Sequence, residues 1–271
     1  MRNPGSAKTF TTLSEKRLRL KVIACEVAAR ELFYCAARSV NTMDITLKPQ
    51  GLHDSSDACR KELQPEIDAV DPKQHDALFL GYGLCNNATA GIRAGRVRLV
   101  IPRAHDCITF FLGSKERYAR VFMRRPGTYY FTAGWIDVHE RGGEHATFDQ
   151  KSGLSKRLAY QELVEKYGEE NAKYLFDSMS SWETHYTHGA LIQYPFTRHL
   201  GLEEKVRAIC AEKKWEFEEI RGSLKLIQDG LDGKWDDARF LIVEPGQEIK
   251  ARYDDSIIEC AACAGATTPA S

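Results

Sequence analysis

Short apolar runs of β-rich composition alternate with helical segments along most of the chain, and this alternation restricts the possible folds more than any other feature. Strands are expected at residues 20–24, 45–47, 77–80, 99–101 and 128–132, and helices at residues 26–40, 53–70, 86–94 and 114–123. Short buried strands that alternate with helices are typical of a parallel sheet covered on both faces. The sequence therefore predicts an α/β fold with a parallel-sheet, Rossmann-like N-terminal lobe.

The same alternation returns later in the chain, after a long helical stretch. Further strands are expected at residues 190–194, 215–220 and 238–243, a helix at 202–214, a helix or turn at 223–231, and a helical bridge at 154–182. We predict four parts from this pattern. They are a tail at 1–17, an N-terminal lobe at 18–150, the bridge with a second, smaller α/β lobe at 151–258, and a tail at 259–271.

Charge and hydropathy exclude several classes of function. The 271 residues include 38 Lys and Arg and 38 Asp and Glu, so no net charge draws the chain onto nucleic acid or anionic lipid. No apolar run approaches the roughly 20 residues that a membrane span requires, and the N-terminal segment lacks the apolar stretch of a secretory signal. We expect a cytoplasmic protein with reduced thiols, so the eight cysteines are candidates for chemistry rather than for cross-links.

Three of the cysteines each follow a predicted strand. Cys25 comes after the first strand, Cys85 after the third and Cys107 after the fourth. The carboxyl ends of parallel strands lie at one edge of the sheet, where ligands bind. We therefore expect the three thiols to converge on a metal centre, either an iron–sulfur cluster with one open iron or a zinc ion with an open fourth position. The alternative is that each cysteine only packs in the core.

Polar residues near these cysteines complete the predicted site. His105, Asp106 and Glu26 are the candidates for proton transfer. Arg103 follows the fourth strand and is the candidate for holding an anionic substrate, and His53 stands at a turn from which it can line the same edge. The alternatives are a helix-dipole charge for Glu26 and an ion pair for Arg103. The leading interpretation is a metal-dependent enzyme that activates a thiol or one-carbon group of a small-molecule substrate.

A second interpretation needs no metal. The segment GYGLCNNATAG at 81–91 predicts a tight glycine turn into a helix, and a thiol at a helix N-terminus has a lowered pKa. Cys85 would then act as a nucleophile or base. The string CNNATA resembles part of the two-cysteine aspartate and glutamate racemases, although their second motif is missing here. A third class is a non-enzymatic carrier of a metal or cofactor. A dinucleotide site is not expected, because Asn86 stands where a third glycine is required.

The other cysteines are expected to have structural roles. Cys35 and Cys59 fall in the middle of predicted helices, and Cys210 does so as well, so we interpret all three as packing residues. Cys260 and Cys263 fall in the predicted C-terminal tail without a second cysteine pair. They form either a metal clip, a lid on the site or part of a dispensable tail.

Across most of residues 20–245 the chain resembles a domain-of-unknown-function family of bacterial and archaeal proteins. The segments that carry the resemblance are IACEV (23–27), GLHD (51–54), LGYGLCNNATAG (80–91), IPRAHDCITFFLGS (101–114), PGTYYFTAGW (126–135) and GKWDDARFLIVEPG (233–246). The residues that match its motifs are Cys25, Glu26, Cys85, His105, Asp106 and Cys107. The chain departs from the family pattern at Asn87-Ala88, where Asn-Gly is usual. The resemblance implies a companion of corrinoid-dependent methyl-transfer systems, and hence a corrinoid methyl-transfer protein as partner.

Overall fold

The computed structural model describes residues 17–54, 56–141 and 186–263, together with residues 164, 165, 168, 169 and 173. For residues 53 and 54 it describes the backbone alone. The predicted N-terminal tail up to residue 16 and the predicted boundary at 150/151 lie outside the described residues. The predicted bridge at 154–182 does so as well, apart from those five residues. In the part of the chain that is described, no helix has both the length and the apolar character needed to cross a membrane.

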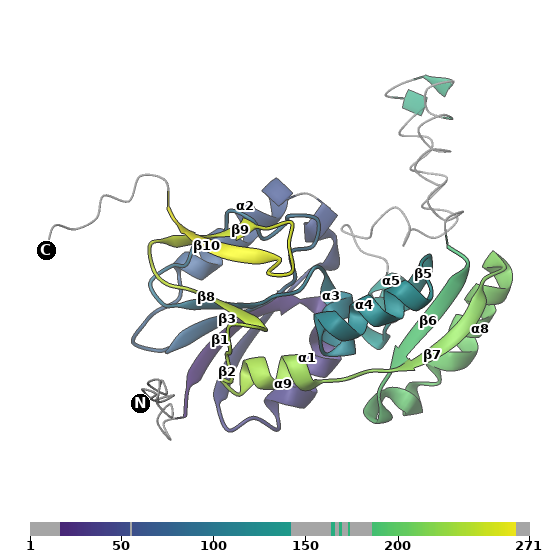
Figure 1. Cartoon of the computed structure of the whole chain (residues 1–271), viewed down its shortest axis with the longest axis horizontal. Coiled ribbons are helices and arrows are strands. Elements are labelled where there is room, and N and C mark those ends of the chain that lie inside the picture. The colour runs from purple at the N-terminus through teal and green to yellow at the C-terminus, as the bar shows by residue number, and fades with distance from the viewer. Residues whose placement is uncertain are drawn as a thin grey trace, which may run out of the picture.

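Four parallel strands and one antiparallel strand form the main sheet (Figure 1). Their order across the sheet is β2 (Thr42–Lys48), β1 (Arg19–Cys25), β3 (Ala77–Gly81), β4 (Leu99–Pro102) and β8 (Phe240–Val243). Strands β1 to β4 run parallel to their neighbours, whereas β8 runs antiparallel to β4. The predicted α/β fold with a parallel sheet is therefore confirmed.

A second, smaller sheet contains three parallel strands. Its order is β5 (Thr128–Phe131), β6 (His188–Gln193) and β7 (Glu216–Arg221). Each sheet contains a strand from the other side of the lobe boundary predicted at 150/151. Strand β5 precedes that division and pairs with β6, while β8 follows it and pairs with β4.

Helices and a hairpin cover both faces of the main sheet, as Figure 1 shows. The helices α1 (Ala29–Ala36) and α9 (Lys225–Leu231) pack together on one face. On the other face lie α2 (Ser56–Asp68) and a hairpin of β9 (Gln247–Ala251) and β10 (Ile258–Ala262). All five residues of β3 are buried as a result, which explains why its sequence is apolar throughout. The hairpin was not predicted, and residues 259–262 of the predicted tail belong to it.

The second sheet has its own apolar cluster. One face packs against α5 (Ala133–Arg141) and α8 (Leu202–Lys213), whose buried side chains join those of β5 and β6. The opposite face carries Ala190 and Ile192, which belong to the larger core that the main sheet shares. The helix α4 (Lys115–Arg124) lies beside this sheet, and the turn η5 (Pro195–Leu200) links β6 to α8. The helices predicted at 114–123 and 202–214 are thus confirmed.

The helix predicted at residues 86–94 is wrong. Turns occupy this segment instead, and Cys85, Asn86 and Asn87 have positive φ angles of 43°, 55° and 63°. A right-handed helix cannot begin through three left-handed residues, and asparagine is among the few residues that accept this conformation readily. Some amides of this segment bind neighbouring carbonyls of the turn, and two bind the hairpin. The amide of Gly91 donates to the carbonyl of Ile249 at 2.7 Å.

Candidate functional site at the carboxyl edge of the main sheet

The three cysteines singled out from the sequence lie after three neighbouring parallel strands. Cys25 is the last residue of β1, Cys85 follows β3, and Cys107 begins the short helix α3 (Cys107–Leu112) after β4. The strands β1, β3 and β4 are adjacent in the sheet and run in the same direction. All three cysteines therefore belong to one edge of the sheet, at its centre, which is where open α/β sheets bind ligands.

The loops after β3 and β4 are joined through their backbones. The amide of Cys85 donates to the carbonyl of His105 at 2.7 Å. At Gly83, a Cβ atom would lie only 2.9 Å from the backbone N and Cα of Asp106. A glycine is therefore required where the two loops pass each other. This close approach fixes the position of Cys85 relative to Asp106.

The thiols at this edge are held in their neutral form. Burial raises the pKa of Cys25 to about 12, and the charges of Glu26 and Cys59 add to the rise. Burial also raises the pKa of Cys85 to about 12, with further contributions from Asp106 and Cys25. The lowered pKa that a helix N-terminus would have given Cys85 is therefore wrong, because the loop contains no such helix.

Cys107 has the same electrostatic surroundings. Burial raises its pKa well above the usual value for a thiol, and the next causes are the charges of Cys85, Asp106 and Cys25. Such mutual effects require the groups to lie near one another, because charges in proteins act strongly only over short distances. The structure therefore brings the three predicted thiols into one neighbourhood.

Cys59 is a fourth thiol in this neighbourhood. It is fully buried on α2, and its charge contributes to the raised pKa values of Cys25 and Cys85. From its position in the middle of a predicted helix, only a packing role was predicted for Cys59. What the sequence does not show is the face of the main sheet on which α2 lies (Figure 1), which brings Cys59 near Cys25 and Cys85.

Asp106 has both a structural and an electrostatic role. Its side chain caps α3 by accepting hydrogen bonds from the amides of Ile108 (3.0 Å) and Thr109 (3.4 Å), as N-cap aspartates do. Its other oxygen accepts a hydrogen bond from the hydroxyl of Tyr118 on α4 at 3.1 Å. Burial raises the pKa of Asp106, although these hydrogen bonds oppose the rise. Tyr118 was not predicted as part of the site, because it lies 12 residues beyond Asp106 on another helix.

Tyr82 is a second site residue that the sequence did not reveal. It follows β3 directly, is 3% exposed, and its buried hydroxyl has no hydrogen-bond partner among the described residues. Burial raises its pKa, and the nearby thiols of Cys25, Cys59 and Cys85 contribute. An unsatisfied buried hydroxyl costs about 1–3 kcal/mol, so this group is available to a bound molecule. Its place after a buried strand is the one signal that could have identified it.

Three further predicted residues, Glu26, His105 and His53, have different placements. Glu26 lies at the same edge, where one carboxylate oxygen accepts a hydrogen bond from the amide of Gln50 (3.0 Å) and the other pairs with Arg141 (3.2 Å). His105 is exposed, and its carbonyl rather than its ring makes the contact with Cys85. The side chain of His53 lies outside the described residues.

Arg103 is committed to the backbone of the C-terminal segment. Its guanidinium donates to the carbonyls of Asp237 (2.7 Å), Ser256 (2.9 Å) and Ile258. These bonds fasten the loop after β4 to the segment before β8 and to the start of β10. The contacts support a structural role, so we leave Arg103 out of the proposed chemistry.

The donor set and its arrangement give different answers about a metal. Thiolates are the usual ligands of zinc and iron–sulfur clusters, and four thiols share this neighbourhood. However, among the described residues no group of three or more His, Cys, Asp or Glu side chains is arranged so that it could hold a metal ion. Coordination would therefore require the thiols to come closer together than they lie in this structure.

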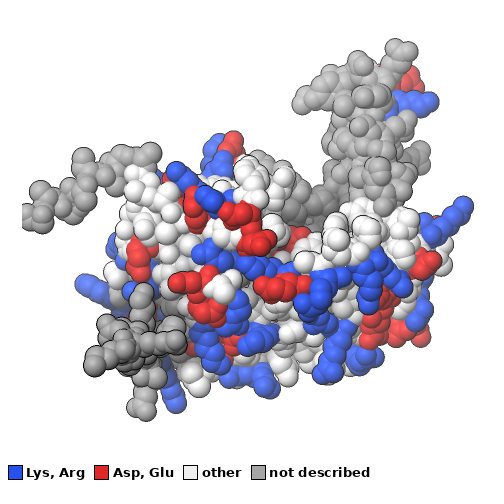
Figure 2. Space-filling view, viewed as in Figure 1, with Lys and Arg blue, Asp and Glu red and all other residues white. Residues whose placement is uncertain are grey.

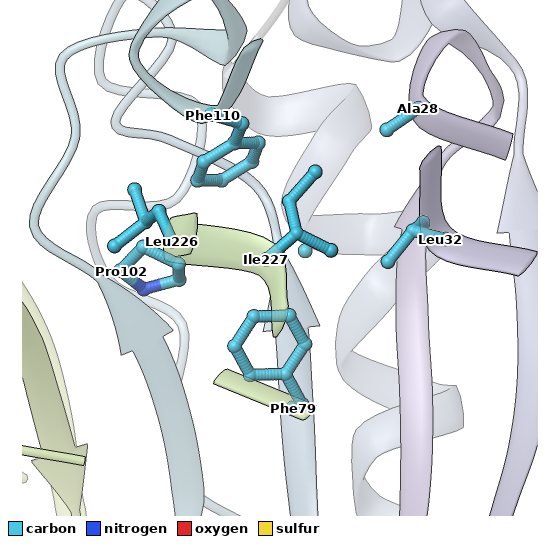
Figure 3. Close-up of a pocket in the computed structure, with 8 residues that line it drawn as sticks. Ala28, Leu32, Phe79, Pro102, Phe110, Leu226 and Ile227 are labelled. Atoms are coloured by element: carbon cyan, nitrogen blue, oxygen red, sulfur yellow. The ribbon is translucent and has the colours of Figure 1, made fainter. Parts of the chain in front are cut away.

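A small apolar cavity lies near this edge, between the sheet and the α1–α9 layer. Figure 3 shows side chains of the sheet and of the helices above it pointing toward one another around this cavity, among them Phe79, Phe110 and Ile227. Its volume is about 10 Å³, which is about the space of one water molecule. The cavity is therefore a gap in the core and not a substrate pocket.

The fold and the site define an open, mostly parallel α/β protein with a cluster of thiols at the carboxyl edge of its main sheet. A family model described as "Protein of unknown function (DUF1638)" matches residues 47–231, which is more than half of the chain. The chain belongs to this family, as its resemblance indicated. The matched range includes Cys85, Asp106 and Cys107 but not Cys25. Comparisons with curated proteins and with solved structures find no match.

Proposed function

We propose that the chain is an enzyme whose reactive centre is the thiol cluster of Cys25, Cys85 and Cys107. In the form that we favour, these thiols bind a soft metal as an iron–sulfur cluster or a zinc ion. The observation that carries the proposal is the placement of the three cysteines by three adjacent parallel strands at one edge of the sheet. Packing alone does not require thiols at the ends of three adjacent strands.

The electrostatics of the cluster favour a bound cation. At pH 7, a thiol with a pKa of about 12 is ionised in only about one molecule in 10⁵. Reactive thiolates at this edge therefore need a compensating positive charge, and the described residues around Cys85 and Cys107 supply negative charge through Asp106. A soft metal provides that charge and lowers the pKa of the thiols that bind it.

The chain's own groups would move protons and orient the substrate. A bound metal with an open position supplies a Lewis acid for a thiol or one-carbon substrate. Asp106, whose pKa is raised by burial, holds or releases a proton beside Cys107. Tyr118 keeps that carboxylate in place through its hydroxyl, and the unsatisfied hydroxyl of Tyr82 donates a hydrogen bond to the bound substrate. Glu26 is a further proton carrier at the end of β1.

A metal-free enzyme is the second candidate, and the arrangement of the side chains favours it. The described thiols do not form a ligand group, and their raised pKa values keep them protonated. Cys85 would then donate a proton to a substrate carbon while Asp106 accepts one. This is the acid–base division of a racemase and does not require a thiolate nucleophile. A carrier that delivers a metal to another protein is the third class.

Metal content in cysteine variants tests the proposal. The full chain is purified anaerobically, and iron and zinc are measured by elemental analysis together with an absorption spectrum. We expect Cys25→Ser, Cys85→Ser and Cys107→Ser each to lower the metal content at least severalfold, because a neutral hydroxyl is a poor ligand. Cys210→Ser is the matched control, since Cys210 is buried on α8 in the apolar cluster of the second sheet. Equal metal in all four variants would defeat the metal form, and a metal-free wild type would favour the acid–base enzyme.

The surroundings in which this enzyme works follow from the same proposal. We place it in the cytoplasm, where thiols stay reduced. A small molecule is its substrate, and a corrinoid methyl-transfer protein is the partner that its one-carbon form requires. Co-purification of the loaded chain with such a protein, and loss of that association in Cys107→Ser, would support the partner.

A further inference from the structure

A second candidate site lies outside the thiol cluster, in a groove between α4 and the edge strand β7. The groove has a volume of about 460 Å³ and is lined by Arg117, Arg120, Arg124, Arg221, Glu218 and Glu219. Figure 2 shows Lys and Arg side chains gathered over α4 in the same view. This concentration is notable in a chain whose charges balance overall.

Arginines already occupy the two carboxylates of the groove. Glu218 pairs with Arg124, and its second oxygen lies 3.6 Å from Arg125. Glu219 pairs with Arg198 of η5. Neither carboxylate is therefore free to neutralise the remaining arginines of the groove.

Three guanidinium groups of the groove are not paired with a carboxylate of the described residues. Arg117 donates to the carbonyls of Leu112 (3.2 Å) and Arg221, which orients it without neutralising it. Arg120 and Arg221 are exposed. Neither Arg120 nor Arg221 forms an ion pair with another described residue. The groove thus presents three charged donors on two elements that the Arg117 hydrogen bond holds together.

We propose that this groove binds a phosphoryl-bearing small molecule, with a diphosphate group as the recognised chemistry. Guanidinium groups match phosphate oxygens with two parallel hydrogen bonds, which an ammonium does not do. Arg117 and Arg124 are seven residues apart, so the groove extends about 10 Å along α4, enough for two linked phosphoryl groups. Its volume is in the range of small-molecule sites. The lining has no aromatic anchor of the kind that protein interfaces use.

Titration calorimetry with inorganic pyrophosphate tests this site on the full chain. We expect the wild type to bind pyrophosphate, and Arg120→Gln and Arg221→Gln each to weaken binding about tenfold. Added NaCl should weaken the binding as well. Arg96→Gln is the matched control, because Arg96 is an exposed arginine outside the groove. The affinity of this variant for pyrophosphate should equal that of the wild type. Circular dichroism spectra establish that the variants are folded.

Several outcomes would overturn the proposal. They are an absence of binding at millimolar pyrophosphate, equal affinity in the wild type and both groove variants, and an equal loss in the Arg96 control. Tighter binding of an acidic peptide such as oligoglutamate would also overturn it, because the groove would then be a protein-docking surface. The result does not depend on the metal content of the cysteine variants.

Discussion

Glu31 offers a sharp test of the energetics of this fold. It lies on α1, is fully buried, and neither carboxylate oxygen has a hydrogen-bond partner among the described residues. Burial raises its pKa from 4.5 to about 7, and the nearby charge of Arg30 only partly opposes the rise. The folded protein therefore holds a proton on Glu31 at pH values where the unfolded chain has released it.

This difference makes the free energy of unfolding depend on pH with a definite sign. Between pH 4.5 and 7 the folded state binds more protons than the unfolded state, so the free energy of unfolding falls as the pH rises. A shift from 4.5 to about 7 corresponds to about 3 kcal/mol over the whole window. Between pH 5 and pH 8, the contribution of Glu31 should decrease by about 2.5 kcal/mol.

Urea unfolding of the wild type and of Glu31→Gln at pH 5 and pH 8 measures this contribution. The difference between the two proteins cancels the titration of all other groups, and the variant should gain about 2.5 kcal/mol relative to the wild type at the higher pH. Glu204→Gln, at an exposed position on α8, should show no such gain. A difference between wild type and Glu31→Gln that is the same at both pH values would refute the reasoning.

Two further predictions concern residues beside the thiols. Asp106→Ala should lower the free energy of unfolding by about 2 kcal/mol, because it removes the cap of α3 and the partner of Tyr118. Asp106→Asn should lower it by less than about 1 kcal/mol, since asparagine also caps helices. Equal losses for the two variants in urea unfolding would contradict the capping role. Arg103→Ala should destabilise the protein by about 2–4 kcal/mol through loss of its bonds to backbone carbonyls. It should leave the metal content per folded molecule unchanged, and a specific loss of metal would return Arg103 to the site.

Strand positions could be read from the sequence because burial on both faces leaves a clear local mark. The run ALFL at 77–80 corresponds to β3, which is buried throughout, and no other element competes for such a segment. The order of the strands across the two sheets has no comparable local signal in the sequence. Strand β8 was expected in a second lobe but pairs antiparallel with β4, and this choice depends on tertiary packing rather than on residues 240–243.

The candidate site was predictable to the extent that topology defines it. Parallel strands have their carboxyl ends at one edge, so Cys25, Cys85 and Cys107 could be placed together without any knowledge of side chains. Contacts that cross between elements could not be predicted in this way. Tyr118 reaches Asp106 from a different helix, and the charge of Cys59 on α2 affects the pKa values of Cys25 and Cys85. The pattern GYGLCNN also gave the wrong backbone, because the same residues fit a helix start and a left-handed turn.

The left-handed turn makes the site dependent on a distant part of the chain. Three successive non-glycine residues with positive φ are unfavourable in isolation, at about 1 kcal/mol or more each for ordinary residues. The surrounding structure must therefore hold them. The hairpin does so by accepting hydrogen bonds from Gly91 and Ala94 through the carbonyls of Ile249 and Gln247. Cys25, at the end of a central strand, needs no such support. Disruption of the hairpin should therefore displace Cys85 before it affects Cys25, and the C-terminal segment is part of the machinery that assembles the thiol cluster.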